Sequence, residues 1–195
     1  MVELSTFGEG SDVMSYQPYD PDVPEVFAEI KTLILRGLPA VEVEHVGSTS
    51  IPGVGGRNVI DLAVLAPERD HGAVRASLQN IGFEPSPFPH YLPLLVATAS
   101  RDGRDHPVLA YVVAPDSDVY TGWISFRDHM LTHPEDADGY DQVKRQAIAD
   151  GHAEGEAYQV AKTPFILGVV DKIERAPGKQ VATDRGLRPS PFVDR

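Results

Sequence analysis

The residues best suited to chemistry lie in one stretch, His45 to Leu65, which reads HVGSTSIPGVGGRNVIDLAVL. It combines glycines with three consecutive hydroxyl side chains, one basic residue and an aspartate, Asp61, set inside an otherwise apolar run. Backbone N–H groups and hydroxyls in a glycine loop suit an anion, and a carboxylate oxygen is the kind of ligand that magnesium prefers. The stretch therefore predicts an anion or nucleotide site.

Each part of this stretch also has a structural interpretation. One of the hydroxyls of Ser48, Thr49 and Ser50 could cap a short helical turn, because such side chains accept hydrogen bonds from free backbone N–H groups and the following Ile51-Pro52 suits an early helical position. Asp61 could be a structural acid bonded to the neighbouring loop. The combination of strand, Gly-Ser loop and aspartate-bearing strand is more specific than either part, and it favours a site.

The residues around the loop predict the elements that hold it. Valines that alternate with polar residues from Val41 to Val46 are typical of a half-buried strand, and Val59 to Leu65 forms a second apolar run. Leu94–Ala99 and Val108–Val113 are expected to pair as a hairpin across the polar turn from Ser100 to Asp105. Helices are expected at Val23–Arg36, within Pro67–Gly82, from Tyr120 to His133, at Glu135–Asp150, and at Glu154–Arg175 with a bend or break near Pro164.

These elements predict an α+β fold. We expect one domain over residues 16–175, built on a mixed or antiparallel sheet of about four or five strands, with helices packed on it and a helical C-terminal part. Residues 1–15 are polar and are expected to form a loosely ordered N-terminal segment. Residues 176–195 are rich in proline, glycine and basic residues and are expected to form a tail, with Phe192 as its anchor if it docks.

Composition limits the partners. The formal net charge of −12 argues against general nucleic-acid binding, which depends on clustered lysine and arginine. The chain has no cysteine, so disulfides and thiolate metal sites are excluded. No apolar run approaches the roughly 20 residues of a membrane span, and the first residues lack the pattern of a signal peptide. The cytoplasm is therefore the expected location.

The residues His45-Val46-Gly47-Ser48-Thr49-Ser50-Ile51-Pro52-Gly53, followed by Arg57 and by Val59-Ile60-Asp61, resemble the signature of the GrpB-like proteins. This family lies in the nucleotidyltransferase-like, polymerase-beta-type superfamily, and the similarity extends over roughly Tyr16 to Ile173. It implies that Gly47 and Ser48 contact the phosphates of a nucleotide. It also implies that Asp61 is the catalytic and magnesium-binding carboxylate of any activity that remains.

Two departures from the superfamily pattern limit that activity. The second metal-binding acid is expected two residues after the first, where this chain has Ala63, and two-metal catalysis needs clustered oxygen ligands. Family members also tend to carry histidines in a later strand, where this chain reads Leu109-Ala110-Tyr111-Val112-Val113. We therefore expect magnesium to bind weakly without a ligand, because magnesium usually relies on substrate phosphates for its remaining coordination.

Two functions follow as hypotheses. The first is a protein that binds a nucleotide or related phosphorylated ligand, with an incomplete metal site. Its expected ligand-binding residues are Gly47, Ser48, Thr49, Ser50, Arg57, Arg127 and Lys162. Lys144 is a weaker candidate because helix lysines are usually solvated or paired. The second is a non-catalytic accessory or interaction domain with a protein partner, for example in coenzyme A biosynthesis, since the family's domain is fused to dephospho-coenzyme A kinase in some actinobacterial chains.

Histidines suggest one further alternative. His129 and His133 are four residues apart within HMLTH, which places both imidazoles on one helix face, as in zinc proteases. The glutamate that should follow the first histidine is Met130, and a third ligand would have to come from elsewhere, for example Asp136 or His152. His106, before Pro107, is expected to be a solvated loop histidine.

Overall fold

The computed structural model describes residues 1–7, 15–87, 90, 92–152 and 155–176. Its sheet contains six strands, β1 (Glu3–Ser5), β2 (Glu42–Val46), β3 (Ile60–Leu65), β4 (Glu84–Pro85), β5 (Leu94–Arg101) and β6 (Arg104–Val113). The strand order is β1-β5-β6-β3-β2, and β4 pairs with β5. Only β3 and β6 run parallel, so the sheet is mixed. The predicted α+β class is confirmed.

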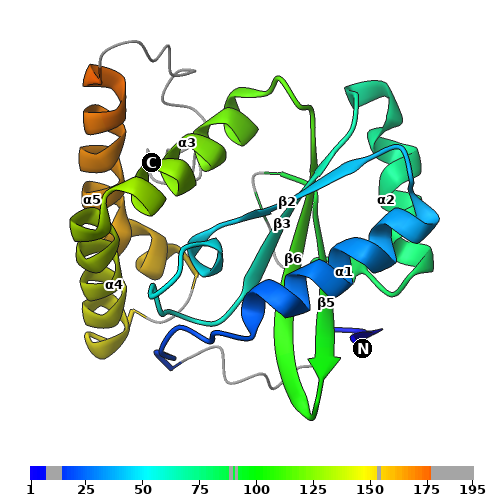
Figure 1. Ribbon diagram of the computed structural model, residues 1–195, viewed down its shortest axis with the longest axis horizontal. Coiled ribbons are helices and arrows are strands. Elements are labelled where there is room, and N and C mark those ends of the chain that lie inside the picture. Colours follow the sequence, from blue (N-terminus) through cyan, green and yellow to red (C-terminus); the bar gives the residue numbers. More distant parts are fainter. Residues whose placement is uncertain (8–14, 88–89, 91, 153–154, 177–195) are drawn as a thin grey trace.

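Five α-helices accompany the sheet within the described residues: α1 (Val23–Gly37), α2 (His71–Asn80), α3 (Asp118–Thr132), α4 (Pro134–Ala149) and α5 (Gly155–Arg175). Short 3-10 turns occupy Ser48–Ser50 and Glu68–Asp70. In Figure 1, α1 crosses in front of the strands, α2 lies on the right, and α3, α4 and α5 gather on the left. None of these helices is long and apolar enough to cross a membrane.

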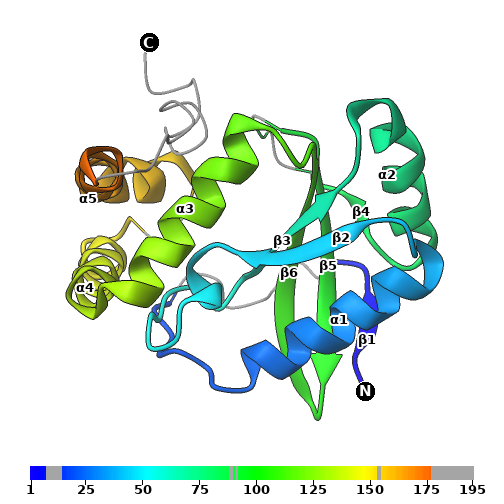
Figure 2. The ribbon, with the colours of Figure 1, turned by 45° about the horizontal axis from the view of Figure 1, so that its top comes forward.

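Each face of the sheet has its own hydrophobic core. On one face, α1 and α2 bury Ile30 and Leu78 against Leu62 of β3. On the other face, the side chains of Ala63 and Tyr111 pack with Trp123 of α3. A third cluster joins the loop after β2 to the helices, with Ile51, Phe126 and Ile173 among its members. Figure 2 shows α3 running between the sheet and the α4–α5 pair. The loop predicted as the site therefore lies where sheet and helices meet.

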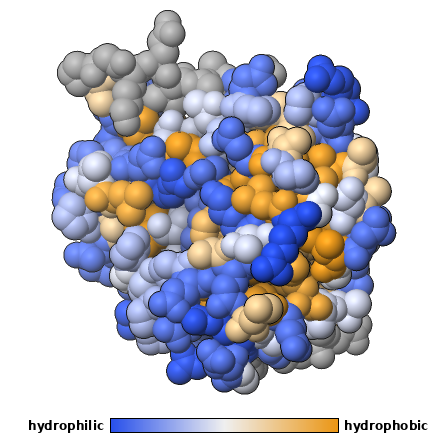
Figure 3. Space-filling model, turned by 45° about the vertical axis from the view of Figure 1, so that its right-hand side comes forward, coloured by the Kyte–Doolittle hydropathy of each residue, from blue (hydrophilic) through white to orange (hydrophobic). Residues whose placement is uncertain are grey.

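The outer surface over α1 and α2 is mixed in character. Figure 3 turns this side of the molecule forward and shows hydrophobic surface interrupted by hydrophilic side chains. Partly buried apolar residues border the first core, namely Leu4, Phe27, Leu35, Leu38 and Ile81. Such scattered apolar surface is normal for a folded domain, so this face carries no functional assignment.

Several local predictions differ from the structure. Glu3–Ser5 is not loosely attached, because its backbone pairs with Thr98–Ser100 at the edge of the sheet. The hairpin turn is only Asp102-Gly103, since both residues adopt positive φ and can close a two-residue turn. The longer β6 that results places His106 in a strand, where it is 2% exposed rather than solvated. Pro164 lies inside α5 and does not break the helix, which leaves the bend as the part of that prediction that stands. The predicted tail beyond Ala176, with Phe192, lies outside the described residues.

Candidate functional site

Gly47 and Asp61 meet at the end of the sheet. Val46, the last residue of β2, pairs with Asp61 in β3, so the chain enters the Gly-Ser loop directly beside the aspartate. A Cβ atom placed on Gly47 would lie 2.1 Å from Asp61 Oδ2, and Gly47 has a φ of 71°. Only glycine fits both the backbone angle and the contact. The structure therefore brings the loop and the predicted aspartate to one point.

The three hydroxyls of the loop have different tasks. The Thr49 hydroxyl is buried and donates its hydrogen to the Val59 carbonyl at 2.8 Å. Because that hydrogen is used, the Thr49 oxygen accepts a hydrogen bond from His45 Nε2 at 3.0 Å. Burial and the nearby Arg127 lower the pKa of His45 to about 4, so the imidazole is neutral. The Ser50 hydroxyl donates to the Gly47 carbonyl at 2.6 Å. These two hydroxyls hold the loop in shape.

Ser48 is the hydroxyl that remains available. Its side chain is partly exposed and has no hydrogen-bond partner in the part of the chain that the structure describes. It directly follows Gly47 in the chain, next to the Asp61 carboxylate. Of the three predicted hydroxyls, Ser48 is thus the one free to contact a ligand, and Thr49 and Ser50 act through the loop.

Three basic side chains lie close enough to Asp61 for their charges to act on its carboxylate. Arg57, at the end of the loop, and Lys162, from α5, both lie over the ring of Tyr158, with Arg57 Cζ at 4.8 Å and Lys162 Nζ at 4.1 Å from its centroid. Lys144, from α4, lies 4.8 Å from the centroid of Tyr140 and donates to the Gly55 carbonyl. Arg57 and Lys162 therefore lie together over Tyr158, and Lys144 acts on the same carboxylate.

Burial perturbs the charges of this cluster. Desolvation raises the pKa of Asp61 to about 6, although Arg57, Lys162 and Lys144 favour its ionised form. Desolvation also lowers the pKa of Lys144 to about 7 and that of Lys162 to about 7, with a contribution from repulsion by Arg57 in both cases. Burial raises the pKa of Tyr158 to about 12, so its ring carries a neutral hydroxyl. The cluster is positively charged and poorly solvated.

Two side chains of α4 bind the backbone of Gly55 in the loop, one at its N–H group and one at its carbonyl. Gly55 donates its N–H to Asp141 Oδ1 at 2.8 Å, and its carbonyl accepts from Lys144 one helical turn later. The Tyr16 hydroxyl donates to the same Asp141 oxygen at 2.6 Å, and Gln17 pairs with Gly56 through the backbone. Asp141 and Tyr16 were not predicted from the sequence as residues of the site. The Gly55-Gly56 pair was the available signal, since it marks a close approach by other groups.

Arg127 lies apart from this cluster. Its guanidinium contacts Glu44 Oε2 at 2.9 Å, the His45 carbonyl at 3.0 Å and Asp128 Oδ1 at 3.1 Å. Burial alone would lower the pKa of Arg127, but Glu44 and Asp128 raise it, and the three acceptors together satisfy its donors. Arg127 therefore ties α3 to β2, and it is the one predicted cation that the structure does not bring to Asp61.

The residues around Asp61 do not fit a two-metal site. The positions that share its sheet face are Ala63 in β3, Leu109 and Tyr111 in β6, and Val46 and Glu44 in β2. Glu44 is the further acid among them, and Arg127 binds its carboxylate at 2.9 Å. No group of three or more histidine, aspartate or glutamate residues able to hold a metal exists among the described residues. A lone carboxylate beside three cations is a poor cage for magnesium.

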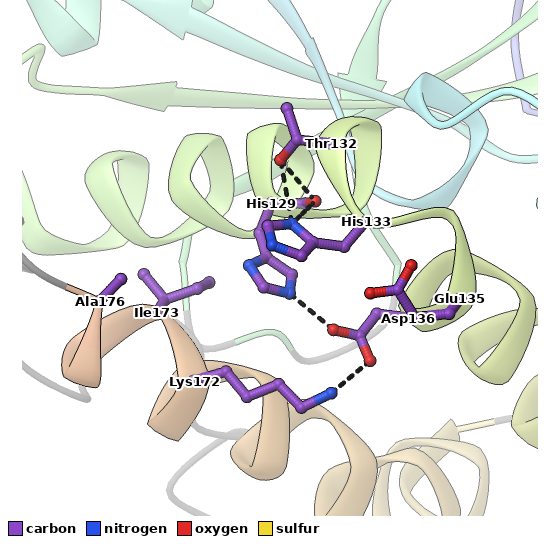
Figure 4. A pocket seen from close by; sticks show the side chains of 8 residues that line it. All are labelled: His129, Thr132, His133, Glu135, Asp136, Lys172, Ile173 and Ala176. Carbon is purple, nitrogen blue, oxygen red and sulfur yellow. Dashed lines mark hydrogen bonds and ion pairs between the residues drawn. The ribbon is translucent and has the colours of Figure 1, made fainter.

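His129 and His133 form a different arrangement, shown in Figure 4. Their rings are stacked, with centroids 3.9 Å apart. His129 Nε2 bonds to Asp136 Oδ2 at 2.7 Å, Lys172 pairs with the other oxygen, and His133 Nδ1 faces the His129 carbonyl. They line a cavity of about 310 Å³ where α3, α4 and α5 meet. Asp136 therefore joins three helices, which is a structural role.

We expect Asp136→Ala to lower the free energy of unfolding by about 1–2 kcal/mol, because the buried His129 would lose its hydrogen-bond partner. Urea denaturation of the variant measures this loss. Asp138→Ala is the matched control, since Asp138 is an exposed acid two residues along the same helix. Equal losses in the two variants would contradict the structural role of Asp136.

Comparison with known proteins identifies the family. The model of the family described as GrpB protein matches residues 14–172. The chain belongs to the GrpB family. The match begins just before Tyr16 and ends within α5, so it includes the Gly-Ser loop, Asp61 and the three cations around it.

Relatives and solved structures agree with this membership. A UPF0157 protein of Halalkalibacterium halodurans is 28% identical over 162 residues, 79% of each chain. One of Pseudomonas aeruginosa is 28% identical, covering 89% of this chain and 70% of the relative. The crystal structure of GrpB from Enterococcus faecalis aligns with a TM-score of 0.58 and 22% identity over 82% of this chain and 94% of that chain. The GLD-2/RNP-8 complex aligns with a TM-score of 0.50 and 14% identity over 84% and 63%. The fold is nucleotidyltransferase-like.

Proposed function

We propose that this GrpB-family protein binds a nucleotide or a related phosphorylated ligand at the Gly47-Ser48 loop. The observation that carries the proposal is Lys162, which is only 7% exposed and has no hydrogen-bond or ion-pair partner among the described residues. A buried ammonium without a partner is costly. A phosphate bound beside it would supply the missing acceptors and remove that cost.

The other residues of the site suit the same ligand. Arg57 has no ion-pair partner within the described ranges, so its guanidinium is free to bind two phosphate oxygens in parallel. The Ser48 hydroxyl donates from the loop, and Gly47 lets the loop pass directly beside Asp61. Lys144 contributes charge while it holds the Gly55 carbonyl. The ring of Tyr158 makes cation–π contacts with both Arg57 and Lys162 and so helps to hold them in place.

The same geometry favours binding over phosphoryl transfer. Transfer by two metals requires oxygen ligands for both ions. Beside Asp61 the sheet offers apolar or phenolic side chains in β3 and β6, and the carboxylate of Glu44 in β2 is bound by Arg127. We therefore assign this member of the GrpB family a ligand-binding role on a nucleotidyltransferase-like fold. An interaction domain for a protein partner is the alternative that remains if no phosphorylated ligand binds.

Thermal unfolding with nucleoside triphosphates and coenzyme A precursors, each with and without magnesium, tests the proposal. A ligand present at a hundred times its Kd stabilises the folded state by about 2.7 kcal/mol, and the unfolding midpoint rises accordingly. No shift with any of these compounds would contradict phosphate binding and would favour the interaction domain.

Ser48→Ala separates ligand contact from loop structure. We expect this variant to lose most of the ligand-induced shift while the free protein unfolds within about 0.5 kcal/mol of wild type, because the Ser48 hydroxyl has no partner within the described chain. Ser50→Ala is the control, since it removes the bond to the Gly47 carbonyl and should cost about 1 kcal/mol without ligand. The same loss in both variants would mean that Ser48 is structural.

A further inference from the structure

The balance of charge around Asp61 indicates what kind of phosphate the site takes. Three cationic side chains, Arg57, Lys144 and Lys162, are coupled electrostatically to this single carboxylate. Asp141, whose charge also acts on Lys144, is engaged by Tyr16, Gly55 and Arg145. With all four groups ionised, the cluster carries two positive charges in excess. A phosphate monoester carries close to two negative charges at neutral pH.

Position distinguishes these cations from ordinary surface charges. Lys144 is 1% exposed and Lys162 is 7% exposed, and they come from two different helices that converge on the loop. Each ammonium lies over its own tyrosine ring, Tyr140 or Tyr158, which fixes its place without neutralising it. The fold therefore gathers cationic side chains where a magnesium-dependent site would instead collect carboxylates.

We propose that the site binds a phosphate monoester without any divalent metal, with Arg57, Lys144 and Lys162 in the role that magnesium plays in a two-metal site. This inference rests on the proposed function and specifies its ligand as a single phosphate group rather than a magnesium-bound triphosphate. Asp61 then serves to hold the cations together, and its carboxylate opposes the ligand's charge instead of coordinating a metal.

Isothermal titration of the full chain at pH 7 with inorganic phosphate, adenosine 5′-monophosphate and adenosine 5′-triphosphate, in EDTA and in excess magnesium, tests the inference. We expect inorganic phosphate or the monophosphate to bind in EDTA with an affinity that magnesium changes less than about threefold. Binding of the triphosphate only with magnesium would overturn the inference and leave the proposed function intact. Absence of binding under every condition would overturn both.

Asp61→Asn distinguishes a site in which Asp61 binds a metal from one in which the three cations bind phosphate alone, because the ligand affinity should change in opposite directions. If Asp61 were a metal ligand, the variant would lose ligand affinity; if the cations act alone, affinity in EDTA should be retained or should rise, because a repulsive charge has been removed. Arg57→Gln should weaken binding about tenfold or more through loss of a charge-assisted pair. Arg69→Gln, an exposed arginine remote from the loop, is the charge-matched control and should leave the affinity unchanged.

Discussion

Gly47→Ala should lower the free energy of unfolding by about 3 kcal/mol, a large share of the stability of a domain this size. Two costs add. A residue with a side chain at a φ of 71° is strained by roughly 1–2 kcal/mol. The new methyl group would also lie 2.1 Å from Asp61 Oδ2 and 2.8 Å from its Cγ, so β2 and β3 could not keep their present distance. Urea denaturation followed by circular dichroism measures the loss.

Gly53→Ala separates the cost of backbone strain from the cost of the clash with Asp61. Gly53 also has a positive φ, of 85°, but a Cβ atom there would have no neighbour within 4 Å. It should therefore show the backbone cost alone. The double variant Gly47→Ala/Asp61→Ala should recover at least about 1 kcal/mol relative to additivity, because the two colliding carboxylate atoms are gone. Equal losses for Gly47→Ala and Gly53→Ala would show that Asp61 does not face the loop, and the candidate site would fail.

Local patterns in the sequence were enough to place the loop and its strands. Alternation around Val43 and the apolar run around Asp61 predicted β2 and β3, and the helical spacing of apolar residues predicted the five helices to within a few residues at their ends. The pairing of Val46 with Asp61 then follows from a loop that joins antiparallel neighbours. These features depend on residues that are close together in the chain, and they can therefore be predicted from the sequence.

Contacts between segments that are far apart in the chain could not be predicted from local patterns. Asp141 lies 86 residues from the Gly55 N–H that it binds, and Lys144 lies 89 residues from the Gly55 carbonyl. On α4 both look like ordinary helix surface residues, yet Lys144 is 1% exposed. Arg127 shows the reverse error, since its charge suggested the site while Glu44 and Asp128 hold it elsewhere. Which helix face meets which loop depends on tertiary packing, and a single sequence carries little information about it.

Lys162→Met should stabilise the free protein by about 2 kcal/mol at pH 7 and at the same time remove the stabilisation by a phosphorylated ligand. Methionine fills a similar space over Tyr158 without a buried charge, and replacing unpaired buried charge by apolar atoms is favourable. Gain of stability with loss of binding is the signature of a residue kept for function. Thermal unfolding with and without inorganic phosphate measures both effects in one experiment.

The shifted pKa values of Lys162 and Asp61 also predict how the free energy of unfolding changes with pH. The pKa of Lys162 falls from 10.5 in the unfolded chain to about 7 in the fold, so the native state binds fewer protons between these values and stability should rise as pH increases from about 7. Asp61 acts in the opposite range, because its raised pKa of about 6 makes stability fall as pH increases from about 4 to about 6. Together these groups should leave a minimum of stability near neutral pH in the unliganded protein.

Lys162→Met should flatten the alkaline limb of that profile, and the part that remains should come from Lys144, whose pKa is lowered to about 7 as well. Lys144→Met is the informative comparison, since it removes the same kind of charge but also the bond to the Gly55 carbonyl, and it should therefore be less stable than Lys162→Met. Lys31→Met, on α1 across the sheet, should change neither the profile nor the ligand response. A Lys162→Met protein that is less stable than wild type at pH 7 would mean that Lys162 is paired within the fold, and phosphate would then have no unsatisfied ammonium to bind.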